Sequence, residues 1–150
     1  VMSTLHTNTA IGAVTRLQDM GVEPFLLSSS LLGVMAQRLV RLLCIECREA
    51  YRPNSLECQL LELSDTNNVV LYRAAGCPSC NETGYRGRTG IYELIEIDEM
   101  LREMIHDGAS EQAMLAQARK NYQGIDADGR RRIIAGETCL EEVLRVTSVQ

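Results

Sequence analysis

Two pairs of cysteines constrain this sequence more than any other feature. Each pair has the spacing C-x-x-C, at Cys44 and Cys47 and again at Cys77 and Cys80, with 29 residues between the pairs. Two intervening residues let both thiolates of a pair reach one ion from a tight turn, and four sulfurs make the closed tetrahedral shell of structural zinc. Pro78 suits the turn around the second pair. The spacing therefore predicts a zinc site that holds a small substructure between the pairs.

Two redox-active pairs or two disulfides are the alternatives for the same cysteines. A reactive C-x-x-C favours a helix N-terminus, where the local field lowers a thiol pKa. Here the first pair follows an apolar run and the second lies in a Gly/Pro turn. No signal-peptide pattern is visible, which also favours metal over disulfides. A closed four-sulfur shell leaves no position for substrate, so the metal is expected to be structural, while Cys58 and Cys139 are expected to be ordinary thiols.

Composition describes a globular chain. Apolar residues make up 45% of the 150 residues, enough for one ordinary core or two small ones. The net charge of -5 argues against a nucleic-acid surface, because phosphate binding needs a basic face. No apolar stretch approaches the ~20 residues of a membrane span. Because Val1 lies inside an apolar run, we interpret the chain as a segment of a longer protein.

Hydrophobic periodicity predicts an α/β chain in three parts, residues 1–43, 44–82 and 83–150. Capping residues and Gly/Pro positions predict the element boundaries, with Leu39 buried in its strand. Glycines at 84, 87 and 90 predict a turn-rich stretch. Strands are expected at residues 1–5, 37–43, 69–72 and 91–97; helices at 10–20, 24–35, 55–63 and 100–105, then from Ser110 to Ala118, from a cap at Asp126 to Gly136, and after a Thr138/Glu141 capping box.

His6 follows the first expected strand and precedes the first expected helix. In open α/β sheets ligands bind at that edge, and a helix N-terminus favours phosphate. His6 is therefore a candidate for contacting a phosphate or its attacking water. The alternative is a histidine that forms an ordinary hydrogen bond in a loop. His106, at the end of a helix, is expected to interact with that helix C-terminus.

The phosphate-binding pattern G-x-x-x-x-G-K-[ST] is absent from the sequence. The single lysine, Lys120, follows Arg119 and not a glycine. These 150 residues therefore do not supply the lysine and hydroxyl that hold ATP and magnesium in such enzymes.

Several segments together resemble the ATPases of type II secretion and type IV pilus assembly. The segment Ser-Thr-Leu-His-Thr-Asn-Thr-Ala is similar to the histidine box of that family. The sequence of these segments is most similar to the type II secretion branch. Pilus retraction ATPases generally lack the cysteine insert, so its presence argues against them. One departure is Ile45, where members often have proline. The similar segments are residues 3–10, 16–17, 19–21, 23–26, 37–41, 76–80, 84–90 and 140–147.

The resemblance implies the C-terminal part of a RecA-like ATPase domain with an inserted zinc subdomain and a helical subdomain. It implies a hexameric ring that hydrolyses ATP with Mg²⁺ and pushes pseudopilins through inner-membrane platform proteins, from the cytoplasmic face of that membrane. The phosphate loop would lie before Val1, so the 150 residues alone would be inactive. His6 would lie near the terminal phosphate, Arg88 near the nucleotide, and the four cysteines would bind zinc. Arg86 and Arg88 as solvated turn charges are the alternative.

Three hypotheses follow. The chain is part of a secretion ATPase, in the type II or the type IV pilus extension branch. Alternatively it is a zinc-stabilised interaction module without nucleotide, or a thiol–disulfide protein. The histidine box favours the first, because an interaction module has no need of it.

Overall fold

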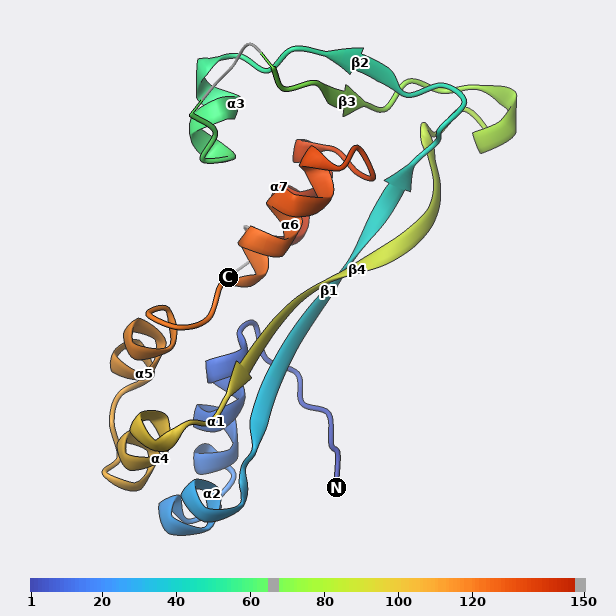
Figure 1. Cartoon of the computed structure of the whole chain (residues 1–150). Helices are drawn as coiled ribbons and strands as arrows, with labels where there is room; N and C mark the ends of the chain where they lie inside the picture. The colour runs from blue at the N-terminus through green and yellow to red at the C-terminus, as the bar shows by residue number, and fades with distance from the viewer. Residues whose placement is uncertain (65–67, 148–150) are drawn as a thin grey trace. The chain divides into compact units, whose positions relative to one another are not determined.

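The computed structural model describes residues 1–64 and 68–147. It confirms a chain of mixed helices and strands (Figure 1). The chain divides into two compact units, one formed by Val1–Gln37 with Tyr92–Ile125, and the other by Arg38–Ile91 with residues 126–147. We call them the first unit and the second unit. None of the helices in the described residues is long and apolar enough to cross a membrane.

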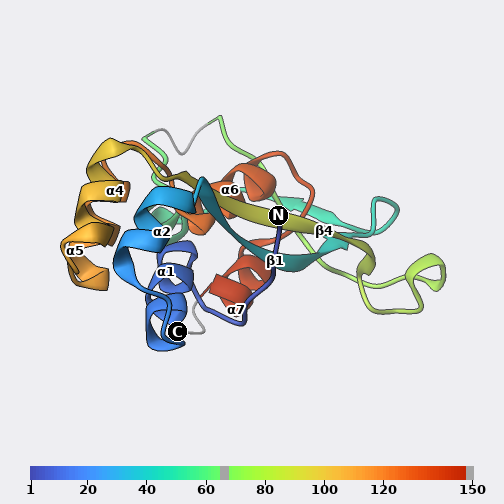
Figure 2. The same ribbon diagram turned by 90° about the horizontal axis from the view of Figure 1, so that it is seen from below.

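Two long strands form one of the two sheets. β1 (Gly33–Leu43) and β4 (Tyr85–Glu96) are hydrogen-bonded neighbours, and both begin in one unit and end in the other (Figures 1 and 2). Val34, Ala36 and Val40 of β1 are buried, as the period of two in a strand requires. Ile91, Ile95 and Ile97 provide the buried apolar side chains in and just after β4.

The first unit packs four helices around its own core. α2 packs on α4, and α5 packs on both α1 and α4. Thr9, Asp98 and Ser110 cap the helices that follow them, each through a side-chain oxygen that accepts from a backbone amide. The helices are α1 (Ala10–Asp19), α2 (Pro24–Ser30), α4 (Glu99–His106) and α5 (Glu111–Ala118), and buried Ile11, Val14, Leu101, Ile105 and Met114 fill the core between them.

The second unit contains the region between the cysteine pairs and the last two helices. β2 (Glu49–Tyr51) and β3 (Leu71–Arg73) form its antiparallel ladder, with α3 (Ser55–Leu60) between them in the sequence. α6 (Ile125–Ile134), apart from its first residue, and α7 (Leu140–Thr147) complete the unit. At Gly129 of α6 an added Cβ would lie 2.5 Å from Val143 Cγ1, so the two helices approach closely there.

Residues 1–5, expected as a buried strand, form none, and Val1 and Met2 are exposed. A strand needs a hydrogen-bonding neighbour, and in the described residues the two sheets consist of β1 with β4 and β2 with β3. The prediction that Leu39 is buried is also wrong. Leu39 is 50% exposed while Val40 is fully buried, because the alternation set by Val34 and Ala36 places even-numbered residues inside.

The glycines at 87 and 90 lie inside β4 and not in a turn-rich stretch. Pairing with β1 outweighs the local preference of glycine for turns. α2 ends at Ser30, earlier than predicted, because the chain continues into β1 from Gly33. The RecA-like topology and the three-part division stay predictions.

Two predicted caps in the second unit are also wrong. Asp126 lies inside α6, which already begins at Ile125, and its carboxylate accepts from Arg130 Nη1 at 2.9 Å. α7 begins at Leu140, and the Thr138 hydroxyl donates to the Arg41 carbonyl and does not cap it.

Candidate metal centre

The ladder of β2 and β3 brings the two cysteine pairs to the same place. Glu49 pairs with Arg73 and Tyr51 with Leu71, in antiparallel register. Cys47 lies two residues before Glu49, and Cys77 lies four residues after Arg73. Both pairs therefore leave the ladder at its same end, which brings together thiols that are far apart in the sequence.

Between the pairs, the described residues 48–64 and 68–76 contain a strand, a helix and a second strand. Asn54 caps α3 by accepting from the Glu57 amide at 2.8 Å, and the Glu57 carboxylate accepts in return from the Asn54 amide. Tyr51 donates its hydroxyl to Glu57 Oε2 at 2.6 Å, which ties β2 to the helix. Cys58 and Leu61 are buried. The gap is thus the small substructure that the spacing predicted.

The backbone of the second pair is bent into a short turn that only particular residues adopt. Pro78 opens a 3₁₀ turn, Pro78–Cys80, and Asn81 follows in the left-handed conformation at φ 56°. Gly84 has φ 82°, and a Cβ there would lie 2.7 Å from the Ala74 Cβ. Glycine at 84 therefore lets the chain pass close to the end of β3.

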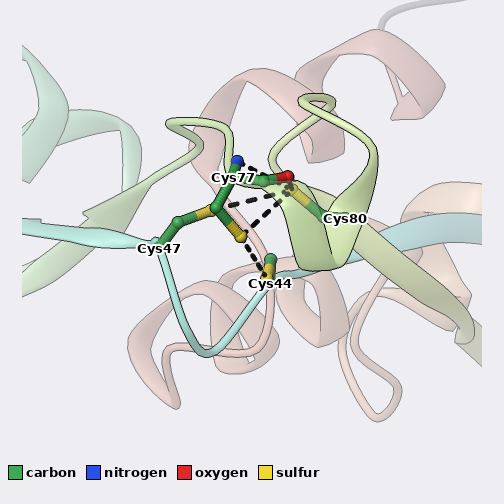
Figure 3. A group of neighbouring side chains, drawn as sticks. All are labelled: Cys44, Cys47, Cys77 and Cys80. Atoms are coloured by element: carbon green, nitrogen blue, oxygen red, sulfur yellow. Dashed lines mark hydrogen bonds between the residues drawn. The ribbon is translucent and has the colours of Figure 1, made fainter.

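The four sulfurs have the spacing of a tetrahedral zinc site. Their Sγ atoms all lie within 4.8 Å of one another, and Figure 3 shows the four side chains pointing toward one another. The Sγ atoms of Cys44 and Cys77, of Cys47 and Cys80, and of Cys77 and Cys80 are each 3.8 Å apart. A tetrahedron with Zn–S bonds of about 2.3 Å has S···S edges of about 3.8 Å. All six cysteines are free thiols, so the four clustered sulfurs are available to one ion.

Hydrogen bonds and burial act in opposite directions on these thiols. Burial raises the pKa of Cys80, but the amides of Cys77 and Gly84, 3.3 and 3.2 Å from its sulfur, outweigh burial and lower that pKa to about 6. Burial raises the pKa of Cys47 to about 12, helped by the neighbouring cysteine thiols. One thiolate is thus held by the backbone, and a full set of four needs a cation to balance its charge.

The residues predicted for nucleotide contact lie elsewhere. His6 is exposed ahead of α1, in the first unit, and Arg88 is exposed on β4, in the second unit. Their roles stay predictions. His106 Nδ1 lies 3.3 Å from Asp107 Oδ1 at the end of α4. Cys58 and Cys139 are buried thiols outside the four-sulfur cluster.

Sequence reasoning missed the residues that support the centre from outside. Arg48, directly after Cys47, donates from Nη1 to the Gly136 carbonyl at 2.7 Å. Its guanidinium also lies over the Tyr72 ring, 4.1 Å from the ring centroid. These partners are far away in the sequence, so no local pattern indicates the contacts. The arginine directly beside a C-x-x-C pair was the single available signal.

Comparison with known proteins gives the family. The model of the family described as type II/IV secretion system protein matches residues 1–145. Type II secretion system protein E of Pseudomonas aeruginosa is 58% identical over 147 residues, which cover 98% of this chain and 29% of that protein. Type II secretion system ATPase E of Vibrio cholerae is 57% identical with the same coverage.

The protein E of Aeromonas hydrophila is also 57% identical, over 150 residues, and again 29% of that protein is matched. The chain therefore spans less than a third of the length of these relatives. The matched family model covers nearly all of the chain, and the histidine-box and cysteine segments both lie inside the matched residues. The chain belongs to the type II/IV secretion system protein family.

Proposed function

We propose that the full-length protein is an ATPase that powers type II protein secretion, and that these 150 residues are its C-terminal part. The observation that carries the proposal is identity of 57% to a protein named type II secretion system ATPase E, over 98% of this chain. Relatives named for type II secretion favour that branch over a type IV pilus extension ATPase.

ATP and Mg²⁺ would bind to the full-length enzyme in a RecA-like domain at the subunit boundaries of a hexameric ring. His6 would lie near the terminal phosphate of ATP and Arg88 near the nucleotide, and both side chains are exposed, as ligand contact requires. The phosphate-binding pattern is absent from these residues, so the 150-residue chain alone would be inactive.

The ring would work at the cytoplasmic face of the inner membrane through platform proteins and would drive pseudopilus assembly. Platform proteins, nucleotide and further copies of the chain are thus its partners in this proposal, and nucleic acid is not. The net charge of -5 is consistent with protein partners.

Cys44, Cys47, Cys77 and Cys80 would hold one structural zinc. The sulfur spacing supports this assignment, because three sulfur pairs lie 3.8 Å apart, which is about the edge of a zinc–thiolate tetrahedron, and all pairs lie within 4.8 Å. With all four positions filled by sulfur, the ion supplies a cross-link between the ends of β2 and β3 and no open coordination position.

The test replaces His6 by alanine in the full-length protein. We expect H6A to lower kcat for ATP hydrolysis about 100-fold, the size of a lost catalytic contact, with zinc content unchanged. His106→Ala is the matched control, since His106 is the other histidine of the chain and is also exposed. It should leave kcat unchanged.

An H6A enzyme with the kcat of the wild type would remove His6 from the mechanism. A zinc-loaded full-length protein that hydrolyses no ATP under any assembly condition would contradict the ATPase proposal as a whole. That result would favour the zinc-stabilised interaction module.

A further inference from the structure

The first cysteine pair is bonded on both flanks to the loop between α6 and α7, residues 135–139. Leu43, directly before Cys44, donates its amide to the Glu137 carbonyl at 2.9 Å. Arg48, directly after Cys47, donates from Nη1 to the Gly136 carbonyl at 2.7 Å. All of these residues belong to the second unit. The loop therefore holds the turn that carries two of the four metal-binding sulfurs.

Arg48 links three parts of the second unit. Its guanidinium stacks on Tyr72 of β3, and both groups meet Gly136. A Cβ at Gly136 would lie 3.1 Å from Arg48 Nη1 and 3.1 Å from two carbons of the Tyr72 ring. Gly136 also has φ 78°, a conformation that favours glycine. The Gly136 backbone, the Arg48 guanidinium and the Tyr72 ring are therefore packed so closely that movement of one would displace the others.

The helices on either side of the loop depend on such contacts. α6 has 10 residues and α7 has 8, lengths at which isolated helices are marginal in water. The Thr138 hydroxyl adds a bond of 2.8 Å to the Arg41 carbonyl, and Glu142 of α7 accepts from the Arg41 amide at 3.0 Å. The α6–α7 hairpin is thus anchored along residues 41–48, the segment that leads into and out of the first pair.

We propose that Arg48 is a positioning residue of the metal centre, and that through it metal binding and the docking of α6 and α7 are one coupled equilibrium. The inference rests on the four-cysteine zinc centre proposed above. Metal fixes the turn between Cys44 and Cys47, the turn presents Leu43 and Arg48 to the loop, and the loop orders both helices. Coupling between two binding events is reciprocal, so a weakened loop contact lowers metal affinity and metal loss loosens the helices.

The first experiment measures zinc affinity of the full-length protein by competition with a chromogenic chelator. We expect Arg48→Gln to weaken zinc binding at least tenfold, within the range of about 10- to 100-fold for lost outer partners of a metal site. Arg73→Gln is the matched control, because Arg73 stacks on Tyr51 at 4.1 Å in the same ladder, as Arg48 does on Tyr72. R73Q should bind zinc as the wild type does.

The second measurement separates positioning from loss of the fold. Cobalt(II) in place of zinc gives the absorption of a tetrahedral four-thiolate site, and R48Q should keep the wild-type spectrum when saturated. Equal zinc affinities of R48Q and the wild type would overturn the proposal. Should R48Q not fold, Thr138→Val removes another anchor of the loop with little change in shape, and the same expectation applies.

Hydrogen exchange tests the coupling directly in the full-length protein, zinc-loaded and chelated. We expect amides of α6 and α7 to lose protection with zinc removal, as those of residues 44–80 do, while α1 and α5 stay protected by their own core. Unchanged protection of α6 and α7 would refute the coupling while leaving the zinc centre intact. A wild-type protein that binds no zinc would refute the centre and the coupling together.

Discussion

Glu142 is a buried carboxylate held by two arginines. Its side chain is 1% exposed and accepts from Arg41 Nη2 at 2.9 Å and from Arg145 Nη2 at 2.7 Å. Burial raises the pKa of Glu142, but the bonds from Arg145 and Arg41 outweigh burial and lower it from 4.5 to about 2. The ionised form is therefore the one that stabilises the second unit.

Glu142→Gln tests this contact through its dependence on pH. The substitution should destabilise the second unit by about 1 to 2 kcal/mol at pH 7, because it removes the charge-assisted hydrogen bonds of Glu142 while the two half-exposed arginines regain water. A lowered folded-state pKa gives stability that is complete above about 4.5 and lost as the pH falls toward about 2. The difference in unfolding free energy between wild type and E142Q should thus shrink over that range in urea titrations. A difference that is constant from pH 7 to pH 2 would contradict the assigned role.

At the scale of elements, the join between the second cysteine pair and β4 depends on one glycine. Gly84 has φ 82°, its amide donates to the Cys80 sulfur at 3.2 Å, and its carbonyl accepts from the Cys44 amide at 2.9 Å. The chain at Gly84 therefore touches both cysteine pairs. An added Cβ would meet the Ala74 Cβ at 2.7 Å, closer than real Cβ atoms approach.

Gly84→Ala should lower the free energy of unfolding of the second unit by about 1 to 3 kcal/mol more than Gly87→Ala does, measured by thermal unfolding. It should also weaken zinc binding. Gly87 is the matched control, since it also has φ 82° and its added Cβ would meet just a Leu42 methyl carbon at 3.7 Å. Backbone strain is common to both variants, so the difference isolates the contact with Ala74. Equal costs for the two variants would show that close packing at Gly84 is unimportant.

Local signals predicted the elements that depend on local chemistry. Ser110 was recognisable as the start of its helix because a cap and its helix are neighbours in the sequence. The four cysteines were recognisable as a candidate metal site because two C-x-x-C pairs together supply the four sulfurs of a structural zinc shell.

The features that the sequence did not predict depend on contacts between residues far apart in the chain. The glycines of β4 predicted turns, and their partner strand β1 overrode that preference. The contacts of Arg48 with Gly136 and of Arg41 with Glu142 join residues 88 and 101 positions apart, so no window of sequence contains both partners. Leu39 was assigned to the wrong face of its strand, because the predicted strand began at residue 37 and left out Val34 and Ala36, whose alternation places even-numbered residues inside.

At the scale of the whole molecule, two units have different sources of stability. The first unit has an apolar core of residues from four helices and the strands beside them. In the part of the chain that the structure describes, the second unit combines its buried apolar side chains with the four-cysteine centre and the ion pairs of Glu142. Metal removal should therefore affect the second unit first, because the binding energy of a structural metal contributes directly to folding.

Metal analysis of the purified, reduced full-length protein tests the central claim most directly. We predict about one zinc per chain. The thiols of Cys44, Cys47, Cys77 and Cys80 should become reactive only when a chelator and denaturant remove the zinc. Cys44→Ser together with Cys77→Ser should abolish zinc binding and serve as the control. A protein without metal, in which the four cysteines form two stable disulfides, would contradict the zinc centre. That result would favour the alternative that the chain is a thiol–disulfide protein.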